Sequence, residues 1–179
     1  MSRLRSGGFA ALLSGLAAVL PALTARAETG PAEAAPQSVP DAHALLTVSG
    51  LRDGTPAVVA FDMAALSALP QVSFTTSTIW TEGPQTFTGV PLGAVLAAAG
   101  MTGRTLQATA ANDYAVQIPV ETWPRNGPVI AYLRNGKPMT LRDKGPLWIV
   151  YPYDSNSAYR TEVIYTRSIW QLDRIDVRP

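Results

Sequence analysis

The chain has 179 residues, no cysteine, one histidine and a formal net charge of +1. The absence of cysteine excludes disulfides, thiolate metal ligands and cysteine nucleophiles. The one histidine, His43, excludes a metal cage built from several histidines of one chain, and a Ser-His-Asp triad would have to use it. Its Pro/Ala-rich surroundings favour a solvated position instead.

Residues 1–27 predict a cleavable secretory signal. Basic residues precede an apolar run over residues 9–23, and Ala25 and Ala27 occupy the small positions that a signal peptidase recognises. The run is shorter than the roughly 20 residues that span a bilayer. We therefore expect a periplasmic or secreted protein that leaves the membrane after cleavage, with an uncleaved anchor as the alternative.

Cleavage would change the charge balance. Residues 1–27 contain three arginines and no acidic residue, so 11 basic and 13 acidic residues remain, a formal charge of −2. No basic run remains, which argues against nucleic acid as a partner. Residues 28–44 are rich in Pro and Ala and predict a flexible linker, followed by one domain over residues 45–179.

The first elements predicted in this domain are a hairpin and a short helix. Residues 45–48 and 57–61 should pair around the Asp-Gly turn at residues 53–54. Asp62 is a good N-cap for a helix over residues 63–69.

A strand and a second helix are expected next. Residues 72–79 are rich in β-branched and aromatic side chains, which favours a strand. Pro91 suits the first turn of a helix, which Gly100 would end. The apolar face of that helix would carry Leu92, Val95, Leu96 and Ala99.

The remainder of the chain is predicted to be mostly strand. Five further strands are expected at residues 105–111, 114–118, 129–133, 147–151 and 174–177. The Asn-Gly pair at residues 135–136 predicts a tight hairpin turn, and residues 119–123 predict a helical turn. Residues 168–172 are expected to bridge to the last strand. Together these elements predict an α+β fold, with a mixed β-sheet and short helices.

Five segments keep a common order across residues 45–179. They read TFTGVPL at 86–92, ANDYAVQIP at 111–119, IAYLRNGKPM at 130–139, GPLWIVYP at 145–152 and RSIW at 167–170. In this order they resemble the molybdopterin-binding domain of the sulfite oxidase family. The resemblance implies an α+β fold of mixed sheets.

The resemblance also shows where this chain departs from the family's enzymes. Those enzymes hold molybdenum through the pterin's dithiolene and one protein cysteine, whose position corresponds to Ser77 here. Thiolate is the soft ligand that this metal takes, whereas a serine hydroxyl is a harder and more basic one. An arginine of the family's fourth segment is Trp148 in this chain. The separated arginines of the signal also differ from the twin-arginine signals that export folded, cofactor-loaded enzymes.

The candidate ligand-binding residues form two groups. Ser77, Thr78 and Trp80 occupy the equivalent of the family's metal-ligand segment. The second group follows a predicted buried strand and comprises Tyr151, Tyr153, Asp154, Arg160 and Arg167. Tyrosine rings and an arginine near a strand end can stack on and pair with a planar anionic ligand.

Other conspicuous residues are expected to be structural. Asn112 and Asp113 should shape a turn, beside which Tyr114 packs. Trp123, Trp148 and Trp170 are expected in the core or at its margin.

Two functions of different classes fit these observations. The first is an exported, degenerate binding module without metal, cofactor or molybdenum redox chemistry, which binds a small anionic ligand or a periplasmic sensory or redox protein. The second is a periplasmic molybdopterin-dependent oxidoreductase with a non-cysteine metal ligand such as Ser77. A scaffold without a ligand pocket is a third interpretation.

Overall fold

The computed structural model describes residues 44–120, 123 and 127–179, all within a compact unit from Ser38 to Pro179. The predicted signal and His43 lie outside the described residues, as do most of the predicted linker and residues 121–122 of the predicted helical turn. Within the described ranges, no helix combines the length and apolar character of a membrane span.

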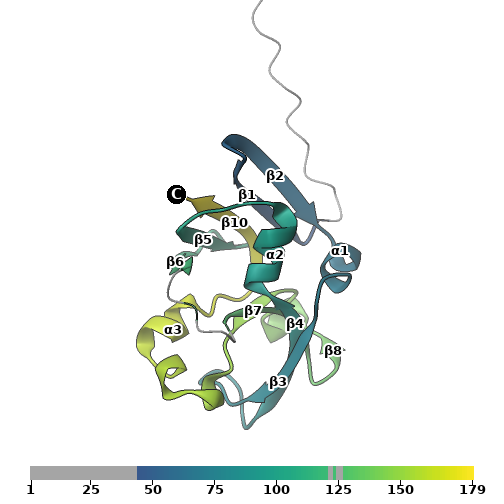
Figure 1. Cartoon of the computed structure of the whole chain (residues 1–179). Helices are drawn as coiled ribbons and strands as arrows, with labels where there is room; N and C mark the ends of the chain where they lie inside the picture. The colour runs from purple at the N-terminus through teal and green to yellow at the C-terminus, as the bar shows by residue number, and fades with distance from the viewer. Residues whose placement is uncertain (1–43, 121–122, 124–126) are drawn as a thin grey trace, which may run out of the picture. The chain divides into compact units, whose positions relative to one another are not determined.

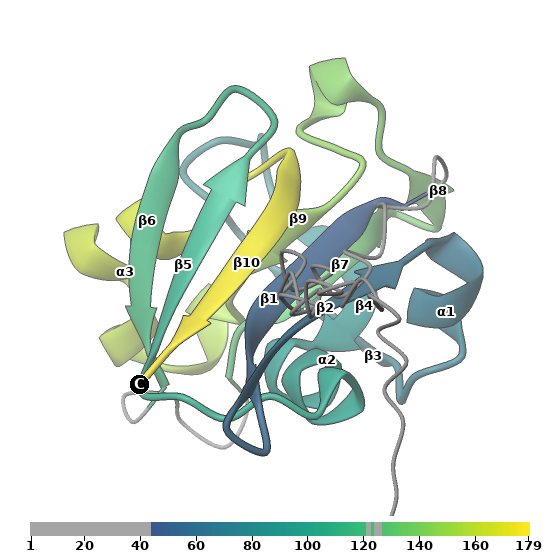
Figure 2. The ribbon, with the colours of Figure 1, turned by 90° about the horizontal axis from the view of Figure 1, so that it is seen from above.

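One five-stranded sheet brings the two ends of the domain together. Its strand order is β2-β1-β10-β5-β6, and β1 runs parallel to β10 while the other neighbours are antiparallel (Figure 2). The strands are β1 (Leu46–Arg52), β2 (Thr55–Phe61), β5 (Thr105–Ala110), β6 (Ala115–Pro119) and β10 (Leu172–Arg178). The hairpin of β1 and β2 confirms the Asp-Gly turn prediction, with Asp53 and Gly54 both at positive φ.

The second sheet has β7 at its centre. Strands β4 and β9 flank β7, β3 pairs with β4, and β8 pairs with the end of β7. The strands are β3 (Val72–Thr76), β4 (Gln85–Pro91), β7 (Val129–Arg134), β8 (Lys137–Pro138) and β9 (Trp148–Val150). Strand β4 was not predicted, because Gly89 and Pro91 disfavour strands and Pro91 suited the first turn of a helix. Pairing with β3 on one side and β7 on the other stabilises it regardless.

The described part of the chain also contains three α-helices, whose places in the fold Figure 1 shows. They are α1 (Met63–Ser67), α2 (Leu92–Ala99) and α3 (Glu162–Arg167), with single 3₁₀ turns at Leu141–Asp143, Tyr153–Ser155 and Ser157–Tyr159. The N-cap prediction at Asp62 is confirmed, since its carboxylate accepts from Ala65 N at 2.7 Å. Gly100 ends α2 in the left-handed conformation, and the Arg52 guanidinium donates to the Ala99 carbonyl there.

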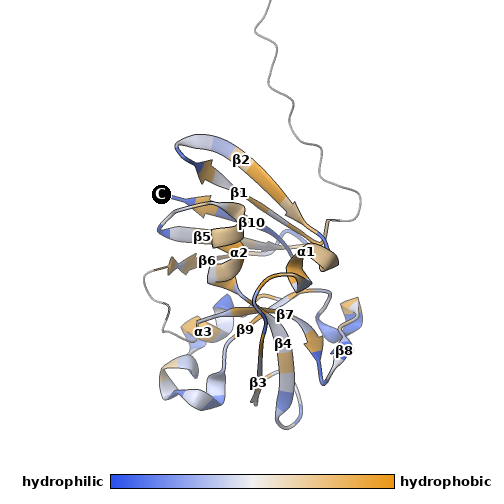
Figure 3. Ribbon diagram, turned by 45° about the vertical axis from the view of Figure 1, so that its right-hand side comes forward, coloured by the Kyte–Doolittle hydropathy of each residue, from blue (hydrophilic) through white to orange (hydrophobic). Residues whose placement is uncertain are grey.

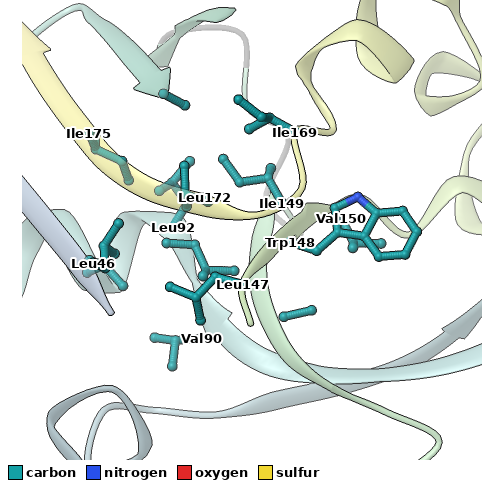
Figure 4. Packing of buried hydrophobic residues seen from close by; sticks show 14 of the residues in the cluster. Leu46, Val90, Leu92, Leu147, Trp148, Ile149, Val150, Ile169, Leu172 and Ile175 are labelled. Carbon is teal, nitrogen blue, oxygen red and sulfur yellow. The ribbon is translucent and has the colours of Figure 1, made fainter. Parts of the chain in front are cut away.

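The core packs α2 and buried strand faces together. Figure 3 shows apolar residues on α2 and on strands of both sheets. Figure 4 shows the packing, in which Leu92 of α2 lies among residues of β1, β4, β9 and β10. Its labelled members include Leu46, Val90, Leu147, Trp148, Ile149, Leu172 and Ile175, all at most 1% exposed. Burial of this apolar area is the main source of stability.

One predicted boundary was wrong in a way that matters for the site. The strand expected over residues 72–79 ends at Thr76. The Thr78 hydroxyl accepts from Trp80 N at 3.1 Å and pairs with the Thr81 hydroxyl at 2.7 Å. These local bonds of the Thr78 hydroxyl compete with strand pairing. They turn the chain after Thr76, so that Trp80 packs inward.

Candidate ligand-binding cavity

Trp80 is the centre of a cluster of aromatic rings. Its ring packs edge-on against Trp148, Tyr165 and Trp170, with centroid separations of 5.7, 5.7 and 5.8 Å. Such edge-to-face pairs are the favoured aromatic geometry and add about 0.5–1.5 kcal/mol each beyond area burial. The rings come from the β3–β4 turn, β9, α3 and the segment before β10, so the cluster joins four distant parts of the sequence.

Ser168 fixes the inner side of this cluster through hydrogen bonds. Its carbonyl accepts from Trp148 Nε1 at 3.1 Å, and its hydroxyl accepts from Tyr153 OH at 2.6 Å. The Ser168 hydroxyl in turn donates to the Ile164 carbonyl at 2.8 Å, which ties it to α3. Burial raises the pKa of Tyr153 well above its usual range, so this phenol stays neutral and serves as a donor.

Asp154 holds the segment that corresponds to the metal-ligand position. Its carboxylate accepts from Ser77 N at 2.6 Å, and its own N–H donates to the buried Thr76 hydroxyl at 3.0 Å. The bond from Ser77 N, above all, lowers the pKa of Asp154; the Ser77 hydroxyl and Arg160 lower it further, whereas partial desolvation opposes them. A negative carboxylate therefore lies directly beside Ser77.

This charge predicts an acid-dependent loss of stability. A carboxyl whose pKa is lowered by folding stabilises the fold above its unfolded pKa and loses that contribution as the pH falls through the folded value. We expect Asp154→Asn to be less stable than wild type at pH 7, by less than about 1 kcal/mol because the carboxylate is exposed. The difference should shrink towards pH 3, as the pH falls below the ordinary carboxyl pKa of 3.8. Urea unfolding at both pH values measures it, and a difference that grows on acidification would contradict the assignment.

A cavity of about 660 Å³ opens beside Trp80. Its lining residues are Ile79, Trp80, Ala110, Asn112, Tyr114, Glu162, Tyr165, Thr166, Ser168, Ile169 and Trp170. Four of these are aromatic, one is a carboxylate, and none is a lysine or arginine. Lys144 lies near this wall without being part of the lining, with its Nζ 4.3 Å from the ring centroid of Trp170.

Large apolar side chains at the rim of the cavity are exposed. Ile79 is 62% exposed, Tyr114 53% and Trp170 37%. A volume of this size, with aromatic walls and few polar groups, is typical of small-molecule sites. Exposed apolar side chains gathered at one place also mark interaction surfaces.

Few of the residues predicted from sequence line this cavity. Trp80 does, whereas Ser77, Thr78, Tyr153 and Asp154 hold the β3–β4 turn and the aromatic cluster in place. Tyr151 is buried behind the cluster, with its ring 6.3 Å from that of Tyr153 and its hydroxyl without a hydrogen-bond partner among described residues. Burial raises the pKa of this Tyr151 phenol as well.

The two predicted arginines are placed differently from each other. Arg160 is exposed and acts on Asp154 electrostatically. Arg167 lines a second hollow of about 400 Å³ between β6 and α3, which shares Tyr114 and Thr166 with the main cavity. The two arginines therefore do not meet in the main cavity.

The cavity also contains residues that the sequence did not suggest as ligand contacts. Glu162 and Tyr165 belong to α3, which was not predicted; its available signal was the Thr161 N-cap, whose hydroxyl accepts from Ile164 N. Asn112, Tyr114 and Trp170 were expected to be structural only. The Asn112 side chain does shape its turn, since its oxygen accepts from Tyr114 N at 3.2 Å. Asn112 also lines the cavity, and its amide nitrogen can act as a donor.

With this geometry in place, comparison with known proteins identifies the family. A family model described as the oxidoreductase molybdopterin binding domain matches residues 33–158. The chain belongs to this family. The resemblance and the α+β fold expected from the sequence are thereby confirmed.

Among solved structures, the chain is similar to the sulfane dehydrogenase SoxCD from Paracoccus pantotrophus. The TM-score is 0.56 at 21% sequence identity, over 74% of this chain and 37% of the SoxCD chain. At this identity the likeness is one of fold, and the chain spans little more than a third of that protein. No curated protein matches the chain in sequence.

The residues around the cavity do not fit a molybdenum–pterin cofactor. No cysteine exists to bind the metal, and the hydroxyl of Ser77 would have to lose its proton beside the negative Asp154. An anionic phosphate would need a cation, whereas the cavity lining contains the Glu162 carboxylate and no lysine or arginine. Among described residues, no group of three or more His, Cys, Asp or Glu side chains gathers to hold another metal.

Proposed function

We propose that this chain is an exported member of the family that binds a small planar ring in the cavity and performs no molybdenum chemistry. The observation that carries the proposal is the cavity itself, whose wall is aromatic and lacks both a thiolate and a lining cation. Aromatic walls favour stacking on a flat ring. The signal predicted at residues 1–27 supports a periplasmic or secreted location, where such a module would serve a sensory or redox partner.

The polar groups of the cavity suggest the character of that ring. The Glu162 carboxylate accepts hydrogen bonds and the Asn112 amide donates them, which suits a nitrogen heterocycle with donors on one edge. The pterin ring of the family's cofactor is one such heterocycle. The sequence favoured an anionic ligand, but the cavity lining favours an uncharged ring over a phosphorylated one.

The test is to purify the exported protein and measure what it carries. Molybdenum is measured by elemental analysis, and released heterocycles by fluorescence after denaturation. We expect less than stoichiometric molybdenum and binding of added 6-substituted pterin without its metal. Stoichiometric molybdenum would contradict the proposal and support the alternative, an oxidoreductase with Ser77 as ligand, which Ser77→Ala would then deprive of metal.

Trp80→Ala tests the site directly. We expect it to weaken binding of the added pterin at least about tenfold, because stacking and apolar burial are lost together. Phe74→Ala is the matched control, since Phe74 is a half-buried aromatic residue outside the cavity lining. Equal losses in both variants, measured by tryptophan or pterin fluorescence titration, would show that the cavity is not the site.

A further inference from the structure

The aromatic walls of the cavity are inclined steeply to one another. The plane of the Trp80 ring makes an angle of 87° with that of Tyr165 and of 72° with that of Trp170. All three side chains line the cavity, together with Tyr114. A flat ligand that stacks on Trp80 can therefore contact Tyr165 and Trp170 only edge-on.

Contacts of this kind depend on the charge of the ligand. The face of an aromatic ring carries partial negative charge and its edge partial positive charge. A cation within about 6 Å of a ring centroid is attracted to the ring face, most strongly to that of tryptophan. A ligand ring with a positive charge is therefore favoured both where it stacks and where its edge meets a second wall. An uncharged ring gains less from the same contacts.

One ring of this wall already lies against a cation of the chain itself. The Nζ of Lys144 is 4.3 Å from the ring centroid of Trp170 and 5.8 Å from that of Trp148. These distances are those of cation–π interactions. Lys144 is not part of the cavity lining, so the ring cluster attracts its charge from outside the cavity. The same charge repels a cationic ligand, which gives the test below a variant that should bind more tightly.

Glu162 provides a negative charge inside the cavity. Of the lining residues that the structure describes, it alone is charged. Glu162 begins α3, whereas Arg167 ends this helix and lines the neighbouring hollow. At 1.5 Å per residue, the two positions are about 7.5 Å apart along the helix axis. The main cavity therefore combines aromatic walls with a carboxylate, which is the combination that favours a cation.

We propose that the ring bound in the cavity is a cationic nitrogen heterocycle. It stacks on one aromatic wall, meets the others with its electropositive edge and pairs with the Glu162 carboxylate. Ligands of this class carry a quaternary or protonated ring nitrogen at neutral pH. The inference rests on the proposed function, because it assigns a charge to the same bound ring.

The test compares two compounds of the same shape that differ by one charge. They are 1-methylquinolinium and 1-methylnaphthalene, each measured by equilibrium dialysis against the purified exported protein at low salt. We expect the cation to bind at least about tenfold more tightly than its neutral counterpart. Salt at about 1 M should reduce this preference, because Glu162 is exposed and its charge is screened.

Three charge variants separate the effect of charge from that of shape. Glu162→Gln should weaken binding of the cation at least about threefold and leave that of the neutral compound within about twofold. Glu82→Gln is the matched control and should change neither, since Glu82 is an exposed glutamate outside the lining. Lys144→Gln should strengthen binding of the cation about twofold or more, because it removes a competing positive charge from Trp170.

Two results would overturn this inference directly. The first is equal affinity of the two compounds for the wild type, a comparison that needs no variant and so decides even if a variant fails to fold. The second is an equal loss of both compounds in Glu162→Gln. Binding of the cation that is unchanged in Trp80→Ala would also contradict it, because the cation would then bind outside the cavity.

A parallel titration of the 6-substituted pterin separates this inference from the proposed function. If the pterin binds and the wild type shows no preference for the cation, this inference fails and the proposed function stands. If none of the three compounds binds, both fail.

Discussion

Replacing Trp148 with alanine is expected to lower the free energy of unfolding by about 3–5 kcal/mol. Trp148 is fully buried, and its ring packs against Phe87, Trp80 and Trp170. Truncation removes these contacts, opens a cavity and leaves the Ser168 carbonyl without the bond from Trp148 Nε1. A domain whose whole stability is about 5–15 kcal/mol would be left marginal.

Urea unfolding followed by circular dichroism measures this loss, with Trp170→Ala as the control. Trp170 belongs to the same ring cluster but is 37% exposed, so its truncation should cost less than half as much. Equal losses for the two variants would contradict the view that Trp148 is a core residue. The comparison also separates the ring that supports the cavity from the ring that forms its rim.

The sequence was sufficient to predict those elements that are determined by residues close together in the chain. The Asp53-Gly54 turn, the Asp62 cap and the Gly100 helix end all act within a few residues, and each is confirmed. The absence of cysteine is likewise complete in the sequence, which is why the departure from the family's enzymes was predictable without a structure.

Elements that depend on distant partners were not predictable in this way. Strand β4 is stabilised by β3 and β7 rather than by its own residues. Helix α3 is short and contains Val163, Ile164 and Thr166, whose β-branched side chains disfavour helices. It forms because Thr161 caps it and Ser168 ties its last turn to the buried Tyr153 and Trp148.

The candidate site illustrates the same limit. Its walls come from the β3–β4 turn, the β5–β6 turn, α3 and the segment before β10, and no spacing in the sequence indicates that these four meet. Trp80 was predicted because it lies near the family's metal-ligand position. Ser77 lies there too, but its N–H donates to the Asp154 carboxylate. Ser77 therefore supports the β3–β4 turn and does not line the cavity.

Gly89→Ala is expected to cost at least about 3 kcal/mol, at or above the upper end of ordinary overpacking. A Cβ at this position would lie 2.1 Å from the Ile130 carbonyl oxygen and 2.6 Å from Ala131 Cα, both backbone atoms of the neighbouring strand β7. The register of β4 on β7 shifts at Thr88 and Gly89, so the two strands approach closely there. Backbone cannot yield as a flexible side chain does, and the clash would separate the strands that support Trp80 and Trp148.

Gly93→Ala is the matched control, and the opposite sign is expected for it. Gly93 lies in helix α2, and an added Cβ would meet only Trp123 at an ordinary contact distance of 3.8 Å. Replacing a helical glycine with alanine should raise the free energy of unfolding by about 0.5–1 kcal/mol. Urea unfolding of both variants decides the matter. A Gly89→Ala protein as stable as wild type would mean that β4 and β7 can separate without loss, and the glycine of the family's first segment would then have no packing role.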